Sequence, residues 1–368
     1  MLSPFLFLAA VYAHTVHKHS IEHATSTQWK RTMCGTPGSG ADIITAWGQT
    51  VDPDKPVLPE YPRPQMTRDP NSTYLNLNGL WEFQLAGPTD PVPFGQTLNQ
   101  TILVPFPLEA CLSGAFAWPS YSKWMFYRVM FDNPFSSSTQ STLLHFGAVD
   151  WNSTVYLNGV RLGTHVGGFD GFFYDLSAGG NLKATSNELI VQVYDPSDSG
   201  YQPNGKQRIS AITNPGGDTY TPSSGIWQTV WLEAVPVGYY ITNLKIRADM
   251  EALYLTVETF PPTAGLAFVN VTFGGQPVTT GQGDTFSEFS LAIPNPHLWS
   301  ALTPSLYDFT VTFRTPAASG YIDVDTVGSY FGMRKVGTMT NGNVTRPTLN
   351  DQPLFLAAWL DQSWWPDG

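Results

Sequence analysis

The first residues in the chain that could do chemistry are four closely spaced histidines: His14, His17, His19 and His23. If the chain were cleaved before His14, the new terminal amine and an imidazole ring could together chelate copper, because imidazole is a good ligand for that metal. The alternative is a solvated tail, because these histidines stand in a polar, proline-containing stretch and only three others exist in the chain. We favour the tail, and we therefore expect no metal and no cofactor.

Aromatic rings form the second candidate group, since three of the 12 tryptophans stand close together near the end of the chain: Trp359, Trp364 and Trp365. A large flat ring can cover the apolar C–H face of a pyranose, so these side chains could form a stacking wall for a sugar. Burial in a core is the alternative, because aromatic side chains contribute much of the packing in β-sandwiches. The residue types alone leave both interpretations open.

The composition indicates many short strands and argues against several partners. The chain has 33 glycines, 30 prolines and 14% aromatic residues, which is typical of strands joined by turns in an all-β protein. Its formal net charge of -11 disfavours nucleic acid as a partner, because binding a phosphate backbone needs a basic surface. No run of about 18 apolar residues occurs, so we expect no membrane-spanning helix.

The first 13 residues, MLSPFLFLAAVYA, are typical of a short secretory signal that is cleaved before His14. Five acceptor triplets for N-glycosylation also favour a secreted, extracellular protein, and they begin at Asn71, Asn99, Asn152, Asn270 and Asn343. The two cysteines, Cys34 and Cys111, allow one disulfide in an oxidising compartment. The sequence gives no Cα separation with which to test that pairing, so it stays open.

The strand pattern divides the chain into parts that must position these residues. Residues 14–70 are polar and proline-rich, which predicts an extended lead-in after the signal at residues 1–13. Strand patterns then recur through residues 71–236 and predict a first β-sandwich. Within it, Asn158-Gly159 supplies the two positive φ angles that a type I′ hairpin turn requires.

A second set of strands follows in residues 237–338, with a cleaner alternation of apolar and polar residues. Leu253, Leu255 and Val257 alternate with Tyr254, Thr256 and Glu258, so the first three should face a core. About seven strands within this length match the architecture of an immunoglobulin-like sandwich. The sequence therefore predicts a second β-sandwich after the first.

The chain ends on residues 339–368, which contain the apolar run LFLAAWL at residues 354–360. A nearly continuous apolar strand is typical of a parallel sheet that is covered on both faces by crossover helices. We therefore expect this run to form the first strand of a further domain.

Short motifs occur through both sandwiches in a recognisable order, at residues 77–83, 104–109, 126–128, 146–151, 155–159, 163–172, 187–193, 224–233, 298–300, 304–307, 330–335 and 349–356. The order resembles the N-terminal part of glycoside hydrolase family 2, the family of β-galactosidases, β-glucuronidases and β-mannosidases. The resemblance implies an all-β fold: a galactose-binding-like jelly-roll sandwich, then an immunoglobulin-like sandwich. It also implies that residues 339–368 begin a truncated catalytic (β/α)8 TIM barrel.

The resemblance implies a retaining exo-β-glycosidase that acts on a terminal β-linked sugar. Such an enzyme needs two carboxyl groups about 5 Å apart, one as acid and one as nucleophile. In the family both are glutamates on later barrel strands, so no residue of this sequence corresponds to them and we expect the chain to be inactive alone. The alternative is a stand-alone, lectin-like carbohydrate-binding protein, which would leave the strand at residues 354–360 as an exposed apolar edge.

The resemblance also points to sugar-binding positions. In the family, jelly-roll loops reach over the barrel mouth, which makes Asp195 and Asp198 candidates to bind a sugar hydroxyl. Both could instead accept backbone hydrogen bonds in an Asx turn, a common role for aspartate. Asp361 and Gln362 follow the expected barrel strand and are candidate subsite residues. Glu188 follows an asparagine, as the acid/base glutamate does in the family, but it leads into a sandwich strand.

Overall fold

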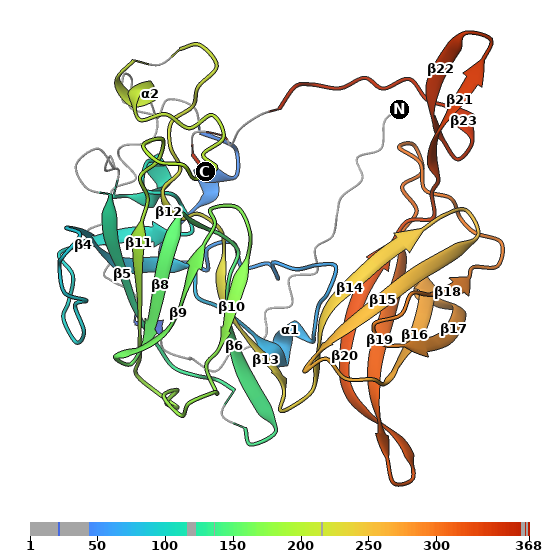
Figure 1. Cartoon of the computed structure of the whole chain (residues 1–368), viewed down its shortest axis with the longest axis horizontal. Coiled ribbons are helices and arrows are strands. Elements are labelled where there is room, and N and C mark those ends of the chain that lie inside the picture. Colours follow the sequence, from blue (N-terminus) through green and yellow to red (C-terminus); the bar gives the residue numbers. More distant parts are fainter. Residues whose placement is uncertain are drawn as a thin grey trace.

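The computed structural model describes residues 21–22, 44–115, 123–135, 137–214, 216–361, 365 and 367–368. The expectations for the signal at residues 1–13, for His14, His17, His19 and His23, and for Cys34 lie outside these residues. The described chain forms two β-rich regions side by side, and a hairpin projects from the second (Figure 1). The prediction of an almost entirely β protein is confirmed.

Helices are few and short in the described residues. They are α1 (Pro70–Thr73) and α2 (Ser210–Thr213), with 3-10 turns at Gly48–Thr50 and Cys111–Ser113. None of the helices described has the length and apolar character needed to cross a membrane. Cys111 is disulfide-bonded.

The first β region, residues 44–236 together with residues 21–22, has its core between its two larger sheets. One sheet has the order β4-β3-β5-β11-β8-β9, with β1 also paired to β5. Its strands are β1 (Ile21–Glu22), β3 (Gly79–Ala86), β4 (Gln100–Val104), β5 (Trp124–Phe131), β8 (Asn152–Leu157), β9 (Val160–Val166) and β11 (Asn187–Tyr194). The second sheet has the order β10-β6-β13-β2. Its strands are β2 (Tyr74–Asn76), β6 (Gln140–Phe146), β10 (Phe172–Asp175) and β13 (Val230–Pro236).

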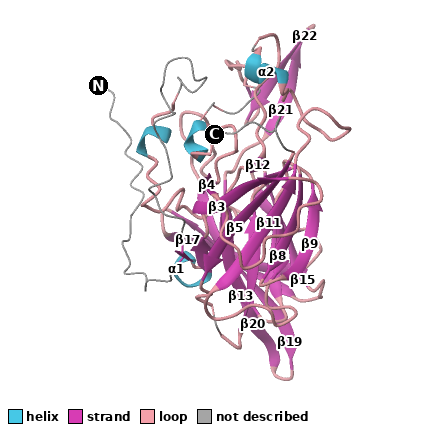
Figure 2. Ribbon diagram, turned by 90° about the vertical axis from the view of Figure 1, so that its left-hand side faces the viewer, coloured by secondary structure: helices cyan, strands magenta, loops and turns pink. Residues whose placement is uncertain are grey.

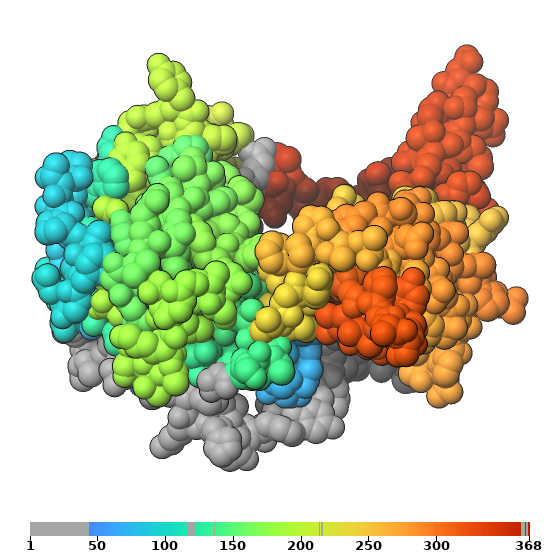
Figure 3. All heavy atoms as spheres, turned by 60° about the horizontal axis from the view of Figure 1, so that its bottom comes forward, coloured from blue at the N-terminus to red at the C-terminus, as the bar shows by residue number. Residues whose placement is uncertain are grey.

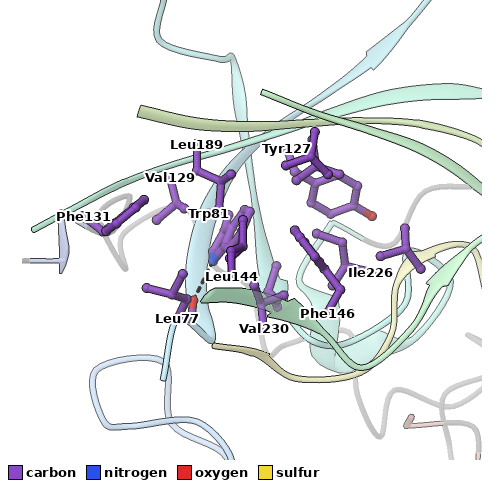
Figure 4. Close-up of a cluster of buried hydrophobic side chains, with 14 of the residues drawn as sticks. Leu77, Trp81, Tyr127, Val129, Phe131, Leu144, Phe146, Leu189, Ile226 and Val230 are labelled. Carbon is purple, nitrogen blue, oxygen red and sulfur yellow. Dashed lines mark hydrogen bonds between the residues drawn. The ribbon is translucent and has the colours of Figure 1, made fainter. Parts of the chain in front are cut away.

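The core of the first region lies between these sheets, and Figure 4 shows part of it. Trp81 is fully buried there, and its indole N–H donates a hydrogen bond of 2.8 Å to the carbonyl of Leu77. Tyr127 from β5 and Phe146 from β6 contribute rings from the two sheets. Burying each such side chain contributes about 1.5–3 kcal/mol, so this core supplies much of the stability of the region.

The predicted hairpin turn at Asn158-Gly159 is confirmed. Asn158 has φ 50° and Gly159 has φ 83°, and they connect β8 to β9 with Leu157 opposite Val160. The Asn158 side chain also accepts a hydrogen bond of 2.9 Å from the backbone N–H of Glu188. The turn is thereby tied to the start of β11 as well as to its own hairpin.

The second β region, residues 240–331, has the same two-layer plan. Three strands pair as β14-β15-β18: β14 (Tyr240–Ala248), β15 (Ala252–Phe260) and β18 (Phe289–Ala292). Four pair as β17-β16-β19-β20: β16 (Leu266–Phe273), β17 (Gln276–Asp284), β19 (Tyr307–Ala317) and β20 (Gly320–Phe331). Leu253, Leu255 and Val257 are fully buried in this core, which confirms the alternation predicted for them.

A buried arginine connects the two regions. Arg68, which precedes α1, donates a hydrogen bond of 2.7 Å to Glu233 on β13 and bonds of 3.1 and 2.6 Å to Asp325 on β20. The same guanidinium donates to the carbonyl of Ile241 at 2.6 Å, just after the chain enters the second region. In Figure 3 a blue patch from this early part of the chain lies between the green first region and the orange second region.

The end of the described chain departs from the prediction. A three-stranded sheet of β21 (Val336–Asn341), β22 (Val344–Leu349) and β23 (Gln352–Pro353) projects from the second region. Residues 354–361 are not a strand, which corrects the expectation of a barrel-opening strand at residues 354–360. The physical reason is that a strand needs a neighbour for its backbone hydrogen bonds, and no described strand is paired with this segment.

Candidate functional site

Three carboxylates from separate parts of the chain are buried at one end of the first β region. Glu109 follows β4, Asp150 ends β7 (Val149–Asp150), and Asp195 directly follows β11. Their exposed fractions are 6%, 4% and 1%, and we call them the acidic cluster. Asp150 pairs with Gly225 of β12 (Gly225–Ile226), and β12 and α2 lie toward this same end of the region (Figure 2).

Neutral groups supply the hydrogen bonds of the acidic cluster. Glu109 accepts a bond of 2.8 Å from the backbone N–H of Ser224, and Asp150 accepts one of 3.1 Å from the side-chain amide of Gln207. Asp195 accepts a bond of 2.7 Å from the backbone N–H two residues further on, which is the Asx-turn geometry anticipated as its alternative role. Each bond holds a carboxyl in place without neutralising a negative charge.

The electrostatic consequence is that these carboxyls hold their protons more tightly than usual. Burial raises the pKa of Glu109 to about 8 and that of Asp150 to about 7, and the negative charge of Asp195 adds to both shifts. Burial likewise raises the pKa of Asp195. Desolvation penalises the charged form of a carboxylate, which explains the direction of all three shifts.

The acidic cluster lacks two things that a catalytic pair or a metal site needs. A general acid must reach the atom that it protonates, and these side chains are almost completely enclosed. Among the residues described, no group of three or more histidine, cysteine, aspartate or glutamate side chains is arranged to hold a metal ion. The acidic cluster is therefore enclosed beneath the loop end, whereas Asp198 lies closer to the surface.

The structure places the predicted sugar-binding residues in two different settings. Asp198 is partly exposed, with its carboxylate 4.0 Å from the guanidinium of Arg208. Trp359 and Asp361 lie on the exposed segment of residues 354–361, and the Trp359 side chain is 99% exposed. Trp365 is 55% exposed, whereas Gln362 and Trp364 lie outside the described residues.

Sequence reasoning missed Glu109 and Asp150, and it gave no weight to Glu233. A signal for Glu109 was available, because a glutamate inside the apolar stretch VPFPLEACL must either reach the surface or find polar partners. Asn187-Glu188 is a strand entry, as favoured from the sequence: it begins β11, and Glu188 forms an ion pair of 2.7 Å with Arg128 of the adjacent strand.

Known proteins are similar in sequence to parts of this chain. The family model for glycosyl hydrolases family 2 matches residues 247–334. A β-galactosidase from Arthrobacter sp. (strain B7) is 27% identical over 308 residues, which cover 82% of this chain and 27% of that protein. A putative β-glucuronidase from Formosa agariphila is 28% identical over 179 residues, 46% of this chain and 20% of that protein. These matches support a member of glycoside hydrolase family 2.

Solved structures share the fold of this chain. A β-glucuronidase from Ruminococcus gnavus in complex with D-glucuronic acid aligns with a TM-score of 0.61 at 21% identity, over 77% of this chain and 49% of that one. The β-glucuronidase of Bifidobacterium dentium gives 0.59 at 22% identity, over 78% and 52%. The alignments thus span between a fifth and about a quarter of the curated relatives, and about half of these structures.

Proposed function

We propose that residues 14–368 form the part of a family 2 exo-β-glycosidase that precedes its catalytic barrel, and that they do not hydrolyse glycosides by themselves. The burial of the acidic cluster is the observation that carries this proposal. A retaining glycosidase needs two carboxyl groups that reach opposite sides of one glycosidic bond. The clustered acids of this chain are enclosed instead, with exposed fractions of 6% or less.

We further propose that the first β region is the sugar-binding jelly roll of the family and the second its immunoglobulin-like sandwich. In this proposal the loop at Asp195 and Asp198 borders the site where a terminal β-linked sugar is held. Asp198 is the better candidate to contact a hydroxyl, because it is partly exposed while Asp195 is 1% exposed. Asp361, Gln362 and the three tryptophans of residues 359–365 would contribute from the adjoining segment.

Secretion is part of the proposal. Asn71, Asn99 and Asn343 are exposed, as glycosylation by a membrane-bound transferase requires, while Asn152 and Asn270 are half-buried. Expression in a eukaryotic secretory host should yield protein in the medium that begins at His14 and loses mass on treatment with an endoglycosidase. Retention of residues 1–13, or an unglycosylated product, would contradict this part of the proposal.

The activity test uses purified protein that spans residues 14–368. Incubation with the nitrophenyl β-glycosides of galactose, glucuronic acid and mannose should release no more chromophore than buffer does. A full-length family 2 β-glucuronidase assayed on the glucuronide in parallel shows that the conditions support turnover. Robust turnover by residues 14–368 would refute the proposal, since it would require a catalytic pair within this chain.

A further inference from the structure

Four Asn-Gly pairs occur in the chain, and they begin at Asn78, Asn158, Asn204 and Asn341. In such a pair the backbone nitrogen of the glycine can attack the side-chain carbonyl carbon of the asparagine, because glycine has no Cβ to crowd the approach. The new C–N bond closes a succinimide ring, and the side-chain nitrogen leaves as ammonia with the proton that the glycine N–H gives up. Water then opens the ring at either of its carbonyls and leaves aspartate or isoaspartate.

The fold decides which of these pairs can react, because all of them consist of the same two residue types. Ring closure needs a side-chain amide that is free to turn and a backbone that can change its conformation. Hydrogen bonds to the amide and pairing of the backbone oppose the reaction, since they must break before the ring forms. The environment of each asparagine therefore predicts its rate of reaction.

Asn78 is held most firmly. Its side-chain oxygen accepts a hydrogen bond of 3.0 Å from the backbone N–H of Val230, and its side-chain nitrogen donates one of 3.2 Å to the carbonyl of Val57. The residue is 5% exposed, and Gly79 is the first residue of β3. The Asn78 amide can reach the nitrogen of Gly79 only after this part of the first region opens.

Asn158 and Asn204 are half-buried and are held less completely. The Asn158 oxygen accepts the hydrogen bond from Glu188, and its side-chain nitrogen donates one of 2.7 Å to the carbonyl of Asn181. The Asn204 side chain lies in a loop and donates a long hydrogen bond of 3.5 Å to the carbonyl of Gln207. We expect Asn204 to react faster than Asn158, because a hydrogen bond of that length is weak.

Asn341 differs from the other three because nothing holds its amide. Among the residues that the structure describes, no hydrogen bond is made by this side chain, and both Asn341 and Gly342 are exposed. Asn341 is the last residue of β21, and its pairing with Val344 of β22 closes the hairpin. Gly342 begins the loop with φ 59°, so its backbone nitrogen stands directly after the last pair of the ladder.

Little packing holds the hairpin that carries Asn341. Within residues 336–349, all of which the structure describes, Thr348 alone is buried. The third strand, β23, pairs with Thr348 and Leu349, at the opposite end of β22 from the loop. The hairpin projects from the second region (Figure 1). A hairpin without a buried apolar face is marginally stable, so its loop end can open while the rest of the protein stays folded.

We propose that Asn341 is a site of spontaneous deamidation in the folded protein, whereas the fold preserves the amides of Asn78 and Asn158. The product carries a negative charge in place of the neutral amide. In the isoaspartate form the backbone also gains a methylene group, which disturbs the register of residue 341 against Val344 and removes the closing pair of the hairpin. The reaction consumes only water and does not depend on the proposed glycosidase.

The test follows all the Asn-Gly pairs in one sample. The chain is produced in the bacterial periplasm, which permits a disulfide and adds no glycan at Asn343, and it is incubated in the folded state at pH 7.5. Digestion and mass spectrometry then measure the mass gain of each Asn-Gly peptide, and an isoaspartyl methyltransferase labels isoaspartate. Asn341 should react about tenfold or more faster than Asn78, because Asn78 reacts only from an opened state. Asn204 and then Asn158 should lie between them.

Two controls separate the effect of the fold from that of the local sequence. In urea, where the chain is unfolded, all the pairs should react at similar rates. Asn341→Gln keeps an amide at this position but would have to close a larger ring, so it should abolish the mass gain at the hairpin and leave the other rates unchanged. Tryptophan fluorescence confirms that the incubated sample stays folded.

Three results would each overturn the proposal. Equal rates for Asn341 and Asn78 in the folded protein would mean that the fold does not select the site. A folded rate at Asn341 that is about tenfold or more below its rate in urea would mean that the hairpin protects the amide. A mass gain that persists in Asn341→Gln would place the modification at another residue of the hairpin.

Discussion

Buried carboxylates occupy two regions of this protein, and their environments are opposite. At the junction between the two β regions, Glu233 and Asp325 share Arg68, and Glu233 is also paired with Arg63. At the loop end of the first region, the acidic cluster of Glu109, Asp150 and Asp195 has hydrogen bonds from neutral donors. Both groups are almost fully enclosed.

The comparison shows that burial alone does not decide the charge of a carboxyl. Burial by itself would raise the pKa of Glu233, but the hydrogen bond from His145 and the charges of Arg63 and Arg68 lower that pKa far below its usual range. Without such partners, burial wins at Glu109 and raises its pKa to about 8. Charged partners therefore favour the ionised form of Glu233 at the junction, while burial without such partners favours the protonated forms of the acidic cluster.

The largest effect is expected from removing the shared cation at the junction. Arg68→Met should lower the free energy of unfolding by about 3–5 kcal/mol, because it leaves buried Asp325 without its charged partner and leaves Glu233 with Arg63 alone. Arg247→Met is the matched control, since the Arg247–Glu288 pair is more than half exposed and should contribute less than about 1 kcal/mol. Denaturant unfolding measures both. Equal effects of the two variants would show that the junction is not held by its charges.

Removing a charge from the acidic cluster should instead increase the free energy of unfolding, and only at higher pH. Because the folded pKa of Glu109 lies above its unfolded value, the folded state keeps a proton that the unfolded state releases, and stability falls between about pH 4.5 and pH 8. Glu109→Gln imitates the protonated form. It should stabilise the protein by about 2–4 kcal/mol at pH 8.5 relative to wild type and change little at pH 5. Destabilisation of equal size at both pH values would contradict the proposed protonation.

Acid should weaken the junction through Glu233. Its folded pKa lies below the unfolded value, so its contribution is present above about pH 4.5 and is lost as the pH falls. The wild type should lose about 2 kcal/mol more than Arg68→Met between pH 4.5 and pH 2.5, because the variant lacks one of the charges that lower this pKa. If thermal unfolding showed the same pH dependence of stability for both proteins, Arg68 would not be a cause of the lowered pKa of Glu233.

The smallest effect is expected at Asp198, which lies on the same loop as Asp195 but is partly exposed. Asp198→Asn should change the free energy of unfolding by less than about 0.5 kcal/mol at both pH 5 and pH 8.5, since exposed charges are solvated and screened. This variant therefore separates the effect of burial on the carboxyl from the effect of its position on the loop. A pH-dependent stabilisation like that of Glu109→Gln would mean that position, rather than burial, sets the behaviour of these carboxyls.

The strands were largely predictable from the sequence, because alternation along a strand is a local property. The residue pattern at positions 124–131 predicts a strand, which is β5, and the pattern at positions 266–273 predicts another, which is β16. Features that depend on the pairing of separate segments were harder to predict from the sequence. The pattern of residues 321–327 and 330–336 predicts two strands, but β20 covers the first and only the start of the second, since its pairing with β19 runs from Gly320 to Phe331. The apolar character of residues 354–360 predicted a strand there, but residues 354–361 form none, because no described strand lies beside them to accept and donate backbone hydrogen bonds.

The sequence by itself determined the all-β character, the Asn158-Gly159 turn and the resemblance to glycoside hydrolase family 2, because each is carried by residue types at short, fixed spacings. Only the tertiary structure decided which acids are charged. Glu233 meets Arg68 across 165 residues of sequence, and Glu109 meets the backbone of Ser224 across 115. The pKa of a buried carboxyl depends on the groups within a few ångströms of it, and the folded chain alone brings those groups together.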